Sequence, residues 1–129
     1  MNDRLFKLHA LANECVDPNW DGHGALPLTQ LAVFRTEAFI RALPESVPLP
    51  EFAPQPDGSI SLDWIQSRHR LFSVSVGVTD RLAFAWLDVT DKGHGVARFD
   101  GERIPPKILQ GIRGIVNRGD AAVWFGVGC

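Results

Sequence analysis

The stretch Ile60-Ser61-Leu62-Asp63-Trp64 alternates large apolar side chains with small polar ones, and this alternation returns twice farther along the chain. It continues through residues 71–78 and again through residues 82–86. Successive side chains of a β-strand point to opposite faces, so a period of two predicts three half-buried strands. Short turns at residues 67–69 and 79–80 favour an antiparallel meander. A fourth strand is expected over residues 95–99, after a loop at residues 91–94.

Helical periodicity appears on both sides of the strands. The first helix is expected over residues 3–14, with Asn2 as its N-cap, and the second begins after the N-cap Thr29 and ends near Leu43. Pro105 suits the first position of a third helix, which continues to about residue 117.

Proline is concentrated in residues 44–56, which predicts an extended crossover between helices and strands, with a possible edge strand at residues 51–53. Residues 121–127 are expected to form a last short strand. The sequence therefore predicts one α+β domain over residues 1–129. Its order is two N-terminal helices, a Pro-rich crossover, an antiparallel meander of four to five strands and a C-terminal helix.

The predicted sheet has two different faces. One face is strongly apolar and must be buried under helices, whereas the other carries mostly small side chains. The small or polar residues of this second face are Ser61, Asp63, Ser73, Ser75, Ala83 and Ala85. Three interpretations stay open: a solvated back of the sheet, a docking surface for a partner, or a face covered by a second helical layer.

Net charge and cysteine content restrict the class of protein. The formal charge is −2, which gives no overall attraction to nucleic acid or anionic membranes, although the C-terminal half is the more basic one. Cys15 and Cys129 are too few for a disulfide framework and are expected to be free thiols. The N-terminus shows no apolar run of the signal-peptide kind, so a cytoplasmic protein is expected.

The loop Asn19-Trp20-Asp21-Gly22-His23-Gly24-Ala25 is the strongest candidate for a site. Its structural interpretation has Trp20 plugging an apolar pocket while Asp21, Gly22 and Gly24 shape the backbone. In its catalytic interpretation Asp21 orients the imidazole of His23, and His94, which lies in a second Gly-His-Gly sequence, joins them as a base or metal ligand.

No established catalytic or cofactor motif is present. The chain has no nucleophile elbow, phosphate loop or dinucleotide fingerprint, and no zinc-ligand spacing. No catalytic residue, metal or cofactor is therefore assigned. A basic group near the third helix, Arg103, Lys107, Arg113 and Arg118, leaves nucleic-acid binding open as a further function.

The motif at residues 19–25, together with Pro56-Asp57-Gly58-Ser59-Ile60 and the strand after it, resembles a group of small bacterial proteins of mobile and accessory genome regions. His23 stands where that group would have an aromatic residue such as tyrosine. The resemblance implies a compact α+β domain and a role in phage or plasmid conflict, as an anti-CRISPR-type inhibitor, an antitoxin or an immunity partner.

The leading functional prediction is therefore a non-enzymatic interaction module that binds a protein or nucleoprotein complex, not a membrane. Its expected binding surface combines the small-residue sheet face with Arg103, Lys107 and Arg113. The alternatives are a small hydrolase or metal-dependent enzyme that uses Asp21, His23 and His94, or nucleic-acid binding through the third helix.

Overall fold

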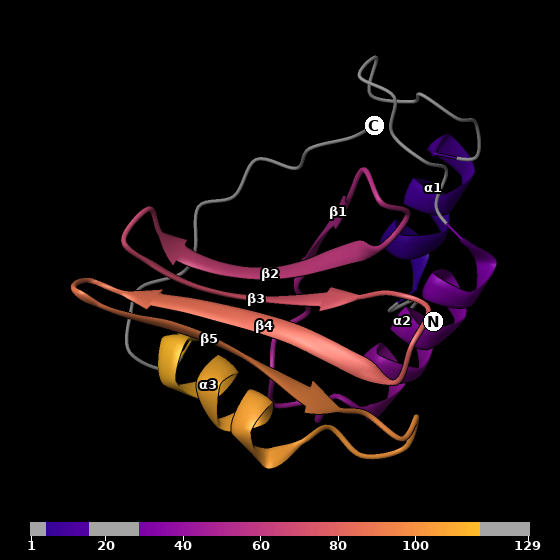
Figure 1. Cartoon of the computed structure of the whole chain (residues 1–129). Helices are drawn as coiled ribbons and strands as arrows, with labels where there is room; N and C mark the ends of the chain where they lie inside the picture. The colour runs from indigo at the N-terminus through magenta and orange to yellow at the C-terminus, as the bar shows by residue number, and fades with distance from the viewer. Residues whose placement is uncertain (1–4, 16–28, 117–129) are drawn as a thin grey trace.

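The computed structural model describes residues 5–15 and 29–116 and confirms the α+β fold. Three helices accompany one five-stranded sheet in these residues (Figure 1). The elements are α1 (Phe6–Glu14), α2 (Gln30–Ala42), β1 (Glu51–Pro54), β2 (Ile60–Ser67), β3 (Arg70–Val76), β4 (Arg81–Asp88), β5 (Asp91–Arg98) and α3 (Pro106–Val116). The predicted last strand, residues 121–127, lies outside the described residues.

Local chemistry explains the start of α2 but not the start of α1. At the start of α2, the hydroxyl of Thr29 accepts a hydrogen bond from the backbone N–H of Ala32 at 3.0 Å, as predicted for an N-cap. α3 begins at Pro106, one residue later than expected. The start of α1 was predicted wrongly, because its N-cap is Leu5, whose side chain caps nothing, and not Asn2.

The strands form one antiparallel meander in the order β1-β2-β3-β4-β5. The Pro-rich crossover leads into β1, which pairs with β2 as the predicted edge strand. Gly58 makes the tight turn between them with a φ of +90°, a conformation that favours glycine. At the other end of the sheet, the backbone N–H of Val89 donates to the carbonyl of His69, which joins the β4–β5 turn to the β2–β3 turn.

The loop predicted at residues 91–94 is wrong, because these residues are the first half of β5. The register runs without interruption from Asp88↔Asp91 to Arg81↔Arg98. Gly93 resembles a turn residue in the sequence, yet the Trp86 ring of β4 covers it in the structure. A glycine beneath a cross-strand aromatic ring can therefore belong to a strand interior.

All three helices pack against the same face of the sheet and form one core with it. This core face carries Ile60, Leu62, Trp64, Phe72, Val74, Val76, Leu82 and Phe84, all buried. The ring of Phe39 from α2 contacts Trp64 and Phe99, with centroids 6.4 and 5.7 Å away. In Figure 1, α1 and α2 lie toward one end of the sheet and α3 lies toward the other; α3 packs mainly against β2 and β3.

Packing of the described helices on one face excludes one interpretation of the second face, a cover by the C-terminal helix. The C-terminal helix does not cover that face, because α3 buries Ile108, Ile112 and Ile115 in the common core. Among the described residues, no helix lies on the small-residue side of the sheet. We call this side the open face; it consists of the outward-pointing residues of β1–β5.

Candidate functional site

The open face brings most of the predicted binding residues together. Cross-strand pairing places Asp63 beside Ser73, Ser73 beside Ala85, and Ala85 beside His94 in one row across four strands. The next row contains Ser61, Ser75, Ala83 and Val96. Adjacent strands lie about 4.8 Å apart, so these rows form a continuous surface of mainly small side chains.

Hydrogen bonds among its own residues hold the polar centre of the open face. The hydroxyls of Ser61 and Ser73 donate to the same carboxylate oxygen of Asp63, at 2.6 and 2.8 Å. The hydroxyl of Ser75 donates to the side-chain oxygen of Gln55. The side chains are therefore fixed before any partner arrives, and little side-chain entropy remains to be lost there on binding.

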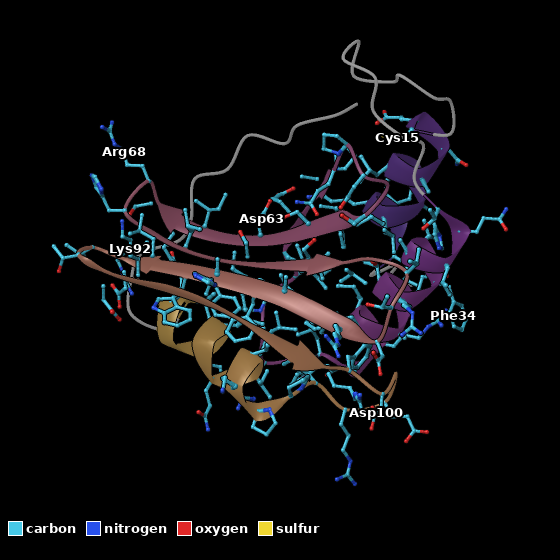
Figure 2. All side chains as sticks on the ribbon, in the orientation of Figure 1. Cys15, Phe34, Asp63, Arg68, Lys92 and Asp100 are labelled. Atoms are coloured by element: carbon cyan, nitrogen blue, oxygen red, sulfur yellow. The ribbon has the colours of Figure 1, made fainter. Side chains whose placement is uncertain are left out.

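Charge is divided across the open face. Glu51 and Asp63 lie on the β1–β2 side, whereas Arg81, Lys92 and Arg98 lie on the β4–β5 side. Arg98 contacts Asp80 at 3.1 Å, and no ion-pair partner for Lys92 is found in the described part of the chain. Figure 2 shows Asp63 near the middle of the sheet and Lys92 at its far end, on the same side as Arg68.

Of the residues in the catalytic interpretation, only some lie in the part of the chain that the structure describes. Trp20, Asp21, Gly22, His23 and Gly24 lie outside the described residues. His94 is exposed on β5 and contacts no carboxylate within residues 5–15 and 29–116. In the same residues, no group of three or more His, Cys, Asp or Glu side chains could hold a metal ion.

The basic residues around α3 do not form a single stripe. Arg103 precedes the helix, where its backbone N–H donates to the carboxylate of Asp100 at 2.9 Å. Lys107 and Arg113 are six residues apart, a spacing that places them on different sides of a helix with 3.6 residues per turn. All three side chains are exposed, whereas Arg118 lies outside the described residues.

The structure also contains a cavity that the sequence analysis missed. It has a volume of about 420 Å³ and lies between α3 and the strands β4 and β5, on the core side of the sheet. Phe84 and Trp86 line it from β4, and Gly111 and Gly114 line it from α3. The sequence did contain a sign of this cavity, since two glycines interrupt an apolar helix. A glycine has no side chain to fill the space between the helix and the sheet.

The prediction of free thiols is wrong for Cys15. This residue follows α1, is fully buried and takes part in a disulfide bond. Cys129 lies outside the described residues.

No described helix is both long enough and apolar enough to cross a membrane. No family model, curated protein or solved structure matches this chain.

Proposed function

We propose that this protein is a non-enzymatic interaction module that binds a protein partner on the open face of its sheet. The observation that carries the proposal is the row Asp63, Ser73, Ala85 and His94, which no described helix covers. Small side chains let a flat partner surface approach the strands closely, and hydrogen-bonded serines present a rigid polar centre.

The charges of the open face indicate what the partner surface carries. An acidic patch on the partner would face Lys92 and Arg81, and a basic patch would face Asp63 and Glu51. Such a divided arrangement fixes the orientation of the partner and disfavours partners with a uniform charge. Inhibition or immunity in phage or plasmid conflict, by occupying a nucleoprotein or toxin surface, is the biological role that we propose for this binding.

The proposal is tested with large side chains on the open face. Ala85→Trp and Ser73→Trp should leave the melting temperature nearly unchanged and should abolish capture of the partner from the native host. Ala10→Trp is the matched control, because Ala10 is also exposed but lies on α1. Arg113→Glu tests the surface of α3 in parallel.

Each outcome bears on the proposal. If the two open-face variants unfold the protein, its own chain covers that face and the docking proposal is wrong. If Arg113→Glu alone abolishes capture, the partner binds at α3 and the proposal for the open face is wrong. Turnover of a small substrate that depends on His94 would replace the interaction role with the enzymatic alternative.

A further inference from the structure

The cavity between α3 and β4–β5, here called the α3 cavity, has an aromatic wall. Phe72, Phe84 and Trp86 line one side. The rings of Phe72 and Phe84 are nearly parallel, at 14°, and those of Phe84 and Trp86 meet at 19°. Phe72 and Phe84 are buried, whereas Trp86 is only partly buried. The wall therefore offers a flat apolar surface that a ligand can reach beside Trp86.

Glycines on α3 keep the opposite side of the cavity open. A Cβ atom at residue 111 would stand 2.3 Å from the Phe72 ring, so the helix backbone closely approaches the wall there. A Cβ atom at residue 114 would meet nothing within 4 Å. The cavity consequently narrows at Gly111 and widens at Gly114, one helical turn farther along.

Two carboxylates stand at the wide end of the cavity. Asp88 and Asp91 are directly opposite each other on β4 and β5, and both line the cavity. Arg70 contacts the Asp88 carboxylate at 3.2 Å, whereas no cation within the described part of the chain pairs with Asp91. Like charges directly opposite on neighbouring strands repel each other; Arg70 offsets the charge of Asp88, so a bound cation would act chiefly on Asp91.

Lys107 lines the narrow part of the cavity, near the start of α3. It precedes Gly114 by seven residues, which corresponds to about 10 Å along the helix axis. The two ends of the cavity therefore differ in charge. A positive group is attracted to the end at Asp88 and Asp91 and repelled from the end at Lys107, which gives a ligand one preferred direction.

We propose that the α3 cavity binds a planar aromatic ligand that carries a positive charge. The rings of the ligand lie along Phe84 and Trp86, and its cationic group lies beside Asp91, where it also faces the Trp86 ring. A volume of about 420 Å³ is within the range of sites for small organic molecules, and it accommodates two or three fused rings. The aromatic wall is on the opposite side of the sheet from the open face, and only His94 and Val96 of the edge strand β5 border both. The proposal does not rest on the proposed function.

Two fluorescent aromatic probes of opposite charge test this proposal. Proflavine is a planar aromatic cation, and 1-anilinonaphthalene-8-sulfonate is an aromatic anion. Titration of the full chain, followed by fluorescence anisotropy at low ionic strength, should give saturable one-to-one binding of proflavine. The anion should bind at least about tenfold more weakly, because it meets the carboxylate of Asp91, which no described cation neutralises, at the open end.

Two variants separate the apolar part of the site from its charge. Gly114→Leu fills the open space beside the helix and should weaken proflavine binding by about tenfold or more. Its control is Arg113→Leu, an exposed substitution on the same helix that does not line the cavity. Asp91→Asn should weaken proflavine binding several-fold, and its control Glu102→Gln removes one negative charge from outside the cavity.

The possible results each support or overturn the proposal. Equal losses in the variants and their controls would show that proflavine binds elsewhere. Anion binding as tight as cation binding, blocked by Gly114→Leu, would overturn the assignment of charge. Absence of saturable proflavine binding by the wild-type chain would overturn the site itself. Thermal melts of every variant show that the fold is intact, and Ala85→Trp on the open face should bind proflavine like the wild type.

Discussion

The ring of Trp86 lies directly on Gly93, so that a Cβ atom added at residue 93 would stand 2.4 Å from the ring. This contact explains why the strand tolerates a glycine, since the indole occupies the space that a side chain would take. We expect Gly93→Ala to push the ring into the α3 cavity and to lower the free energy of unfolding by about 1–3 kcal/mol. Urea denaturation measures the loss. Unchanged stability, with unchanged tryptophan fluorescence, would contradict this packing.

Gly111 and Gly114 provide a matched pair on α3. Alanine at residue 111 would meet the Phe72 ring at 2.3 Å, whereas alanine at residue 114 would meet nothing. Gly111→Ala should therefore destabilise the protein, while Gly114→Ala should stabilise it by about 0.5–1 kcal/mol through helix propensity. Thermal melts of the two variants compare them directly. The prediction fails if both substitutions shift the melting temperature in the same direction.

The sequence predicts the sheet and its two faces well, because a period of two depends only on which side each residue occupies. Ser61, Asp63, Ser73 and Ala85 lie on the open face as predicted. The first half of β5 was predicted as a loop because glycine has a low preference for strands. The Trp86 ring that covers Gly93 and allows it in the strand comes from β4, so the residues around Gly93 do not reveal it. Tertiary contact overrode the local preference.

The α3 cavity could not be predicted from periodicity. Its existence depends on where α3 crosses the sheet, and the helix packs mainly against β2 and β3. β5 receives less cover from α3, so the Trp86 ring and the carboxylates of Asp88 and Asp91 border a space. The position of a helix on a sheet is set by the volumes of facing side chains, such as Gly111 against Phe72. The hydrophobic pattern of a single helix or strand does not reveal it.

Val89 in the β4–β5 turn is strained, because its φ is +62° and its side chain is branched at Cβ. Glycine is preferred at the first central position of a two-residue hairpin turn with positive φ. Val89 is 61% exposed, so removing its side chain costs little burial. We expect Val89→Gly to raise the free energy of unfolding by about 0.5–1 kcal/mol after the entropic cost of glycine.

Thr90→Gly is the control for this turn, because the φ of Thr90 is not positive. It should lower the stability. Equal destabilisation by the two glycine variants, measured in parallel urea titrations, would show that Val89 carries no strain.

Cys15 provides a test of covalent structure. Because its thiol takes part in a disulfide, iodoacetamide should not modify it in the native oxidised protein, and modification should appear after reduction. Cys15→Ser should lower the free energy of unfolding by about 2–4 kcal/mol under oxidising conditions. Peptide mapping by mass spectrometry with and without reductant gives the answer. Full alkylation without reductant would show a free thiol instead.

The turn between β1 and β2 is expected to respond to acid through Asp57. Its carboxylate accepts hydrogen bonds from the hydroxyl of Ser59 and from the Ser59 backbone N–H, the latter at 2.9 Å. These bonds, the hydroxyl first, lower the pKa of Asp57 below its ordinary value of 3.8. A carboxyl group whose pKa is lower in the folded state stabilises the fold when it is ionised.

The stabilisation by Asp57 should therefore be complete above about pH 5 and should be lost as the pH falls through the lowered pKa. Asp57→Asn removes this titration, so the variant should lose less stability than the wild type between about pH 5 and pH 3. Ser59→Ala removes the strongest hydrogen bond and should move the Asp57 pKa back toward 3.8. Carboxyl chemical shifts followed by NMR measure that pKa in both proteins. If it is the same with and without the Ser59 hydroxyl, the hydroxyl does not set the ionisation of Asp57, and the acid response of the turn must come from the backbone N–H alone.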